Sequence, residues 1–277
     1  PLESGYGEKL LGGNHLRIEA PYVIYNEETG YYYMFLSFGG LDSDGGYNIR
    51  VCRSENPSGP YVDSMGQDMK DCKGPAGSAF SDATAELYGT KLMGGYKFTW
   101  KEGEEGEDRK GYLSPGHNSC LYQEETGKYF IIYHTRFENS GETHEVRVHQ
   151  MFFNEEGWPV IAPYRYTEES AEKLESKQLV GTYKYINHGR DISPDMKESE
   201  ELILNKNNTL SGALEGTWEL SGDYNITLKT DEAEYKGIAL KQWDEDGKKY
   251  VMTFTALDSK SGTAIWGSGL NALNAIE

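Results

Sequence analysis

The sequence is poor in the residues that mark several classes of protein. Its 277 residues include only 3 cysteines and 9 prolines. Cys52, Cys72 and Cys120 form no CxxC pair, so neither a zinc site nor a disulfide framework is indicated, although one bridge can form in an oxidising compartment. The chain also lacks any run of 18 apolar residues, which a membrane-spanning helix would need.

Basic residues are scarce as well. Lys and Arg number 27 against 45 Asp and Glu, which gives a formal net charge of −18. Binding to nucleic acid or to an anionic membrane surface needs a cationic face, so this charge argues against both partners. Aromatic residues are abundant at 13%, with 21 tyrosines, although the mean hydropathy is −0.70. Disordered chains are poor in aromatic residues, so the composition predicts a folded protein.

The pattern of residues predicts an all-β chain. With 33 glycines and few prolines, the sequence is typical of short strands joined by tight turns. The expected strands are Tyr31–Phe38, Ile49–Arg53, Lys91–Thr99, Tyr129–Thr135, Glu145–Phe153, Leu202–Leu204, Gly216–Leu220, Tyr224–Lys229, Glu234–Gln242 and Tyr250–Ala256. The best helical candidate, Glu168–Gln178, is mostly charged and is interpreted as a short surface helix or a linker.

An internal repeat organises the first half of the chain. The segment Tyr25–Tyr33 recurs as Tyr122–Phe130, an offset of 97 residues. Each copy reads as a strand, a polar turn that ends in Thr-Gly, and an aromatic-rich strand that is followed by a further strand. This order predicts a repeated four-stranded up-and-down sheet, the layout of a propeller blade. Chance similarity between two hairpins is the alternative.

The repeat in the first half and the different pattern of strands and turns from Leu179 onward predict two domains. Residues 1–167 are expected to form two propeller blades, 168–178 a linker, and 179–277 a small β-barrel or sandwich with Trp218, Phe254 and Trp266 in its core. Propellers close with roughly four to eight blades, so two blades cannot close alone. Because the chain also begins with Pro1 rather than Met, we expect an upstream segment of roughly 200 residues, about three blades, on a separate or unlinked chain.

Each repeat copy carries one polar residue of interest just before its first strand, Glu19 in the first copy and His117 in the second. Glu19 and His117 would converge on one pocket if equivalent strands line one channel. Glu19 lies between Ile18 and Ala20, an apolar frame that would desolvate its carboxyl, as suits a general acid. The alternatives are a carboxylate paired with Arg17 or exposed at the surface, and a turn histidine bonded to the backbone.

Three further residues are candidates for contact with a ligand. Phe38 and Tyr47 offer aromatic faces of the kind against which furanose rings lie, although packing in the core or at a rim explains either residue equally well. Arg136 follows the second aromatic strand near the same end of the sheet. Pairing of Arg136 with Glu142 or Glu145 is the alternative for that residue.

Several of these segments together resemble a known family. Asn14–Tyr22, Leu36–Leu41, Gly46–Val51, Ser114–Ser119 and His144–Gln150 are similar to arabinanases of glycoside hydrolase family 43. Gly216–Trp218, Phe254–Ala256 and Ala264–Gly267 resemble the additional β-barrel domain of the longer members. The resemblance covers nearly the whole chain. It implies the C-terminal blades of a five-bladed β-propeller, followed by the small barrel.

The resemblance also implies a function. It predicts a secreted or extracytoplasmic hydrolase that cleaves α-1,5-linked L-arabinan or arabino-oligosaccharides with inversion, with Glu19 as general acid and a calcium ion held by His117. The family's other two catalytic carboxylates precede the Glu-Ala-Pro motif, and no Asp precedes Glu19 here. We therefore expect the base on an N-terminal fragment, a partner chain.

Other interpretations remain open at the level of sequence. If residues 1–165 closed alone, the base would be sought among Asp42, Asp44 and Asp82, although the Asp42–Gly46 loop is better explained as a solvated turn or a substrate rim. A carbohydrate-binding propeller without catalysis is one alternative function. An α-L-arabinofuranosidase or β-xylosidase on the same scaffold is another.

Overall fold

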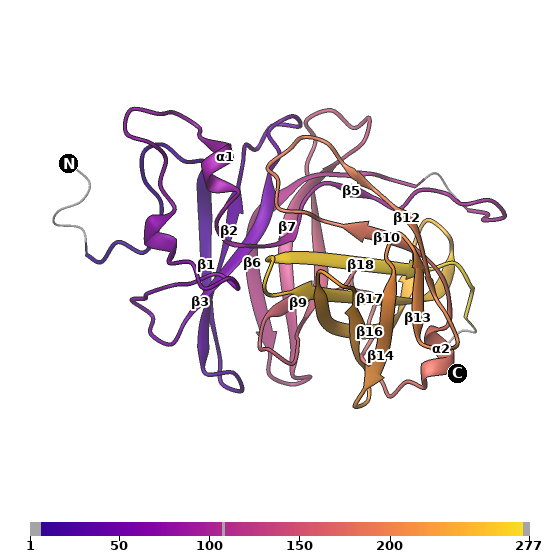
Figure 1. Cartoon of the computed structure of the whole chain (residues 1–277). Coiled ribbons are helices and arrows are strands. Elements are labelled where there is room, and N and C mark those ends of the chain that lie inside the picture. The colour runs from indigo at the N-terminus through magenta and orange to yellow at the C-terminus, as the bar shows by residue number, and fades with distance from the viewer. Residues whose placement is uncertain (1–6, 107–108, 274–277) are drawn as a thin grey trace.

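The computed structural model describes residues 7–106 and 109–273. Within these ranges the chain consists mainly of β-strands and the loops between them (Figure 1), so the all-β prediction is confirmed. The strands form a 12-stranded sheet and a 6-stranded sheet. Short helical segments occur in the loops at η1 (Met69–Asp71), α1 (Asp82–Ala85) and α2 (Ser176–Leu179).

The first half of the chain supplies two similar groups of strands. The first group comprises β1 (Ile18–Asn26), β2 (Tyr31–Phe38), β3 (Asn48–Ser54) and β4 (Thr90–Met93). The second comprises β5 (Tyr96–Lys97), β6 (Tyr112–Gln123), β7 (Lys128–Phe137), β8 (Glu145–Phe153) and β9 (Pro159–Ile161). Both groups are antiparallel meanders in which consecutive strands pair.

The internal repeat is confirmed at the level of strand register. Tyr25 pairs with Tyr32 in the first copy, and Tyr122 pairs with Tyr129 in the second, so the offset of 97 residues is kept on both strands. Both turns end at a glycine of positive φ, Gly30 at 73° and Gly127 at 66°, so the same backbone conformation closes each copy. In the first turn Asn26 Oδ1 also accepts hydrogen bonds from two backbone amides.

The second half of the chain closes into a barrel. Its strands are β10 (Gly181–Asn187), β12 (Glu200–Leu204), β13 (Thr209–Gly212), β14 (Gly216–Ser221), β15 (Asn225–Lys229), β16 (Glu234–Asp244), β17 (Lys249–Asp258) and β18 (Thr263–Gly269). Neighbours pair in the order β18-β10-β12-β13-β14-β15-β16-β17, and β17 pairs with β18 again. Closure leaves no free edge among the eight strands of the barrel.

The predicted propeller blades are wrong. The closed unit is the eight-stranded barrel, and both N-terminal meanders continue into strands from the other half of the chain. β4 lies parallel to β18 through Lys91 and Thr263, and β5 lies parallel to β11 (Lys197–Glu198). The edges of the meanders therefore find partners across the segment 168–178, where we expected a linker between independent units.

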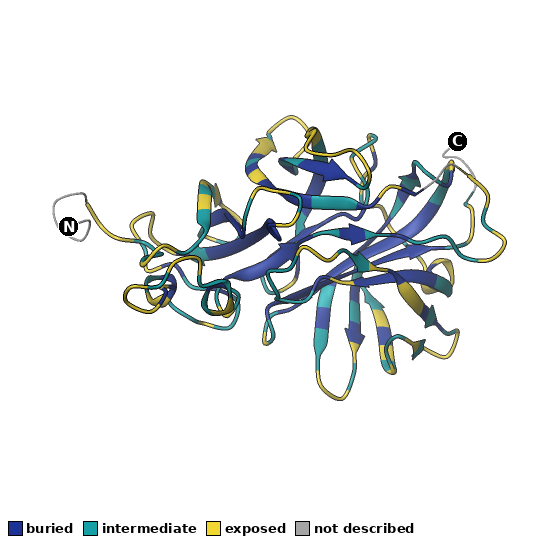
Figure 2. Cartoon of the chain, turned by 90° about the horizontal axis from the view of Figure 1, so that it is seen from above, coloured by how far each residue is buried: buried dark blue, intermediate teal, exposed yellow. Residues whose placement is uncertain are grey.

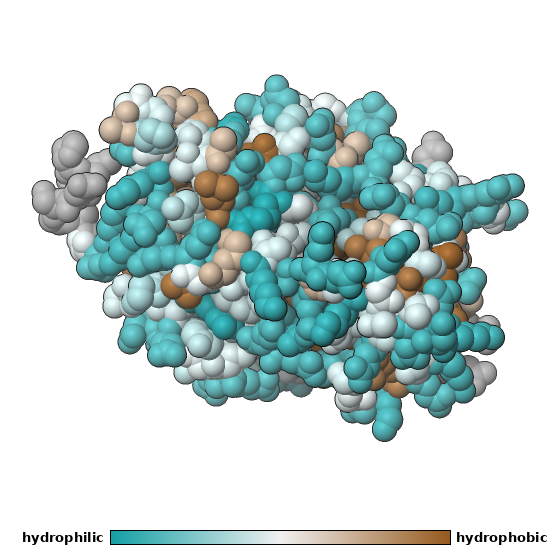
Figure 3. All heavy atoms as spheres, in the orientation of Figure 1, coloured by the Kyte–Doolittle hydropathy of each residue, from teal (hydrophilic) through white to brown (hydrophobic). Residues whose placement is uncertain are grey.

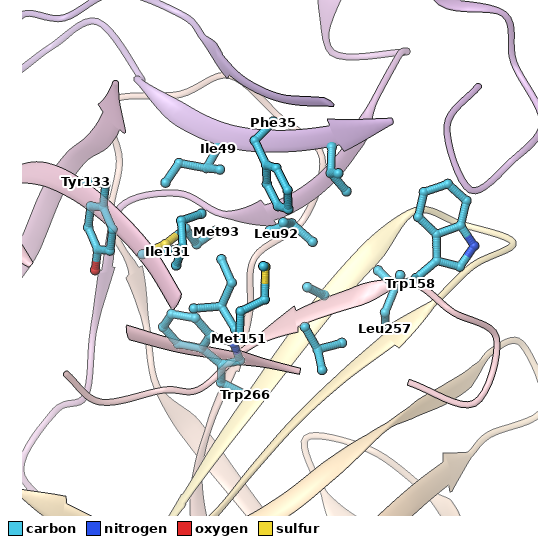
Figure 4. Packing of buried hydrophobic residues seen from close by; sticks show 14 of the residues in the cluster. Phe35, Ile49, Leu92, Met93, Ile131, Tyr133, Met151, Trp158, Leu257 and Trp266 are labelled. Carbon is cyan, nitrogen blue, oxygen red and sulfur yellow. The ribbon is translucent and has the colours of Figure 1, made fainter. Parts of the chain in front are cut away.

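The largest hydrophobic core lies between the sheets and the barrel. It contains Phe35 of β2, Ile131 of β7 and Met151 of β8, and the barrel contributes Leu257 and Trp266 (Figure 4). Side chains from distant parts of the sequence thus share one desolvated cluster, and burial of this apolar area couples the two halves energetically.

The expected core of the barrel is confirmed for two of its three residues. Trp218 and Phe254 are buried in the barrel's own interior. Trp266 is also fully buried, but it points into the shared core, where it meets the rings of Tyr96 and His188. The expectation that Trp266 fills the barrel is therefore wrong.

Burial follows the strands, and exposed residues gather in the loops and hairpin ends (Figure 2). The face shown in Figure 3 is mainly hydrophilic, with small separate apolar patches, as the charge composition predicts. Cys52, Cys72 and Cys120 are buried free thiols. Among the described residues, no helix has the length and hydropathy needed to cross a membrane.

Candidate functional site

A carboxylate and a phenol meet at the start of β1. Glu19 is exposed, and the hydroxyl of Tyr47 donates a hydrogen bond of 2.6 Å to its Oε1. The Tyr47 side chain is 1% exposed. Burial, together with the bond to Glu19, raises the pKa of Tyr47 well above its ordinary value, so the phenol keeps its proton and remains the donor.

The position of Tyr47 depends on a glycine in the second repeat copy. Gly116 of β6 lies against the Tyr47 ring, and a Cβ at position 116 would stand 2.1 Å from Tyr47 Cε1. Real carbon atoms cannot approach so closely, so the site requires glycine here. Gly116 of one repeat copy thus fixes the phenol that orients a carboxylate of the other.

A row of histidines extends from Tyr47. The ring of His134 stacks on Tyr47 at 6.0 Å between centroids and on His117 at 5.9 Å, and it meets His144 edge to face at 4.4 Å. The structure therefore brings Glu19 and His117 into one neighbourhood, with Tyr47 and His134 between them. Burial, followed by the neighbouring His144 and His117, lowers the pKa of His134 to about 4, so this ring is neutral at pH 7.

The backbone is irregular at matching places in the two repeat copies. Ala20, directly after Glu19, has a φ of 52°, and His117, which is 97 residues later, has a φ of 49°. The strand register shifts between Glu19 and Tyr22, and again on either side of Gly116. Bulges re-aim side chains, and positive φ at residues other than glycine is strained and clusters at functional sites. This shared irregularity marks the region as a site.

Arg136 holds two loops at the rim of this region. Its side chain is buried, and its guanidinium donates to the carbonyl of Leu41 and pairs with Glu142 at 2.7 Å. Glu142 in turn accepts a hydrogen bond of 2.9 Å from Ser43. Arg136 is thus paired with Glu142, which was one of the alternatives for this residue, and it joins the loops that carry Leu41 and Glu142.

The two aromatic residues expected to stack on a sugar are both enclosed. Phe38 is fully buried, and the guanidinium of Arg50 lies 4.9 Å from its ring centroid. Tyr47 is buried as well, and its hydroxyl is the part that reaches Glu19. The folded chain covers the faces of both rings, which agrees with packing in the core, the alternative explanation for these two residues.

The environment of Glu19 also differs from the expected one. The apolar neighbours Ile18 and Ala20 do not enclose its carboxyl, because Glu19 is exposed. Arg17 does not pair with it either, since the Arg17 Nε donates to Asp82 Oδ1 at 3.1 Å. What holds Glu19 is the Tyr47 hydroxyl, a partner that no pattern in the sequence indicated.

The site offers a metal ion few protein ligands. No group of three or more His, Cys, Asp or Glu side chains that could hold a metal occurs in the described part of the chain. His117 is exposed and can give one imidazole nitrogen, while Asp42 and Asp44 are exposed on the loop after β2. These residues do not make the oxygen-rich cage of six to eight ligands that calcium takes.

His134 and His144 were missed by reasoning from sequence. One signal was available for His134, because it lies 97 residues after Ser37, the residue paired with Glu19 across β1 and β2. The repeat offset thus places His134 opposite Gly116 in the second copy.

Comparison with known families agrees with this arrangement. Residues 12–159, more than half of the chain, match the model of glycosyl hydrolases family 43. The chain belongs to glycosyl hydrolase family 43. Residues 163–267 match a C-terminal lipocalin-like domain associated with that family, which fits the closed barrel. The resemblance seen in the sequence is thereby confirmed.

Two relatives in family 43 are similar over 95% of this chain. An extracellular endo-α-(1→5)-L-arabinanase of Bacillus subtilis is 53% identical over 264 residues. An extracellular endo-α-(1→5)-L-arabinanase of Thermotoga petrophila is 49% identical over 268 residues. The chain spans 55% of the length of each. These matches give no support to the expected partner, an N-terminal fragment on a separate chain.

Solved structures of family 43 proteins share the fold. A glycoside hydrolase of Bacillus licheniformis gives a TM-score of 0.91 at 51% identity over 96% of this chain and 58% of its own. The endo-1,5-α-L-arabinanase of Thermotoga petrophila gives 0.89 at 47% identity, with the same coverage of both chains. The agreement extends over the sheets and the barrel together, and it supports the correction of the predicted fold.

Proposed function

We propose that this chain hydrolyses α-1,5-linked L-arabinan, with Glu19 as the proton donor. The observation that carries the assignment is the exposed carboxyl of Glu19 held by the buried Tyr47 hydroxyl at 2.6 Å. Membership of family 43 and the names of the two relatives support the reaction and the substrate. The relatives' names also support an extracellular location.

The hydrogen bond assigns different tasks to the two oxygens of Glu19. Oε1 accepts from Tyr47, so Oε2 carries the acidic proton. When the glycosidic C–O bond breaks, this proton passes to the leaving oxygen, and Glu19 becomes a carboxylate. The Tyr47 hydroxyl then donates to an anion, and such charge-assisted bonds are stronger than neutral ones. Proton transfer of this kind contributes about 10²–10⁴-fold to a rate.

The proposed stereochemistry is inversion. In an inverting glycosidase one carboxylic acid protonates the leaving oxygen, and a second carboxyl group, about 6.5–9.5 Å away, activates water on the opposite face of the sugar. Glu19 fills the first role in this scheme. Inversion predicts that the first product from an α-linked chain is the β-anomer, which proton NMR detects before mutarotation. An α-anomer as the first product contradicts this part of the proposal.

The proposed mode of attack is internal. Both relatives are named endo-acting. Endo cleavage lowers the viscosity of linear arabinan faster than it releases reducing ends, whereas exo cleavage does the reverse. Measuring both quantities on one reaction distinguishes the modes, and slow loss of viscosity with rapid release of reducing ends contradicts endo action.

A panel of substrates tests the proposal against its alternatives. We expect hydrolysis of linear arabinan to exceed that of arabinoxylan and of an aryl β-xyloside. Preference for short aryl arabinofuranosides would indicate an arabinofuranosidase, and preference for the xyloside a β-xylosidase. Binding of arabinan without any hydrolysis would indicate a binding protein, and it would overturn the proposal.

Calcium at His117, which the family resemblance implies, remains a separate prediction. His117 lies beside His134, and among the described residues no group of three possible metal ligands surrounds it, so an ion there would take waters as further ligands. Removal of calcium with a chelator tests it by melting temperature. An unchanged melting temperature after chelation counts against a bound ion.

A further inference from the structure

A second cleft lies between the six-stranded sheet and the barrel. Its lining includes Tyr112 of β6, Phe137 of β7, Tyr164 after β9, and Trp243 near the end of β16. The Tyr112 and Phe137 rings meet edge to face at 4.8 Å, so they form a continuous aromatic floor. Trp243 is half-buried. The cleft shares no residue with the Glu19 site.

Two charged side chains lie at this aromatic floor and can each form a further hydrogen bond. The Arg147 guanidinium lies 4.6 Å from the Phe137 centroid and pairs with Glu145 at 3.0 Å, whereas its buried Nε has no hydrogen-bond partner. Asp246 receives a hydrogen bond of 3.3 Å from the backbone amide of Lys110. Burial raises the pKa of Asp246, as expected for a carboxyl turned into a cleft. A ligand can therefore meet both a donor and an acceptor.

The charges around the cleft nearly balance. Lys110, Arg147 and Arg165 face Glu245 and Asp246, and Arg165 pairs with Glu245 at 2.5 Å. A strongly anionic ligand would find its cations already opposed by carboxylates. A neutral ligand with neighbouring hydroxyls suits the site better, because each hydroxyl both donates and accepts hydrogen bonds. Aromatic walls with a few convergent polar groups are typical of small-molecule sites.

We propose that this cleft is a second saccharide-binding site that holds the furanose units of short arabino-oligosaccharides apart from the Glu19 site. The choice of arabinose rests on the proposed function, whereas the choice of a neutral saccharide rests on the cleft itself. A ring packs on Trp243, the half-buried aromatic residue of the cleft, and its hydroxyls bond to Arg147 and Asp246. Such a site keeps the enzyme attached to its polysaccharide substrate while the Glu19 site acts on it.

The five tryptophans allow a direct test by ¹⁹F NMR. The chain is labelled with 5-fluorotryptophan and carries Glu19→Gln, so that arabinotriose is not consumed. The resonance of Trp243 is assigned by its loss in Trp243→Phe. We expect this resonance to shift saturably as arabinotriose is added, while those of the buried Trp158, Trp218 and Trp266 stay in place.

Two variants test the polar contacts. We expect Asp246→Asn and Arg147→Met each to raise the dissociation constant for arabinotriose about tenfold, since each removes a hydrogen bond to a charged group. Tyr122→Ala is the matched control, because it removes an exposed aromatic ring outside the cleft and should leave the constant unchanged. Unaltered melting temperatures show that the variants fold.

Three results would overturn the inference. In the first, the Trp243 resonance does not move at saturating arabinotriose. In the second, it shifts with the same dissociation constant in the protein that carries Glu19→Gln alone and in both cleft variants. Trigalacturonate can also move it at a lower concentration than arabinotriose, which contradicts a neutral ligand. Hydrolysis of arabinan, measured separately on the unmutated chain, tests the proposed function, so the two failures are distinguishable.

Discussion

The Tyr47 hydroxyl and the Glu19 carboxyl are joined by a hydrogen bond of 2.6 Å between the residue that precedes β3 and strand β1. The phenol is buried and the carboxylate is exposed, so the protein side of the bond is rigid and the other side faces solvent. In the proposed reaction this geometry leaves Oε2 as the oxygen that releases the proton, and Tyr47 serves as a positioning residue.

Tyr47→Phe removes that hydrogen bond and keeps the ring. We expect kcat on linear arabinan to fall about 10–100-fold, since a bond to a charged group contributes about 1.5–3 kcal/mol, whereas KM changes little. Steady-state kinetics separate the two constants. A raised KM with an unchanged kcat would show that Tyr47 acts on binding and not on proton transfer.

Gly116→Ala places a methyl group where the Tyr47 ring lies, at 2.1 Å from Cε1. Overpacking of this kind costs about 1–3 kcal/mol of unfolding free energy, and it should also displace the phenol and lower kcat. Denaturant unfolding measures the cost. In a double-mutant cycle, Tyr47→Ala with Gly116→Ala should recover part of the stability lost by Gly116→Ala alone. Additive losses contradict the proposed contact.

His149 makes stability depend on pH. Its Nδ1 bonds to the Ala162 carbonyl at 2.8 Å and its Nε2 to the Tyr133 hydroxyl at 2.9 Å, so the ring is held neutral. Burial lowers the pKa of His149 to about 4, whereas an unfolded histidine titrates near 6.5. Between these values only the unfolded chain takes up the proton. The unfolding free energy therefore falls as the pH drops, by about 1.4 kcal/mol per pH unit, and is restored above pH 6.5.

Urea unfolding of the wild type and of His149→Gln at pH 7 and pH 5 checks this effect. The wild type should lose about 2 kcal/mol more than the variant between the two pH values, which follows from the same linkage. Equal losses in both proteins would show that His149 does not carry the pH dependence.

A buried ion network at the barrel should contribute strongly to stability. Arg109 donates two hydrogen bonds to Asp244, at 3.0 and 2.7 Å, and Lys184 lies 3.7 Å from the same carboxylate. Asp244→Ala leaves both cations without this partner, and loss of one member of a buried pair costs about 3–5 kcal/mol. Asp223→Ala breaks an exposed pair with Lys173 and should cost less than about 0.5 kcal/mol. Thermal unfolding compares the two.

Local features were predictable from the sequence. The strands Tyr31–Phe38 and Glu145–Phe153 have the predicted bounds, and the repeat keeps its offset through the register. Alternation and the Thr-Gly turns determine these features within a few residues, so no distant partner is needed to find them. The family resemblance rested on equally local motifs.

Long-range pairing could not be predicted in the same way. β4 and β5 are four and two residues long, too short to show a period, and their partners β18 and β11 lie more than 100 residues later. Burial of Phe38 likewise depends on Arg50 from the neighbouring strand. An aromatic residue beside a loop looks the same in sequence whether it faces a sugar or a guanidinium.

The role of Glu19 as proton donor is tested most directly by Glu19→Gln, which keeps the shape of the side chain and removes its acidic proton. The account predicts that turnover of linear arabinan falls by at least about 10²–10⁴-fold. Turnover of an aryl arabinofuranoside with a good leaving group should fall much less, because such a group departs without a proton. Equal losses on the two substrates, or full activity on arabinan, would contradict the account.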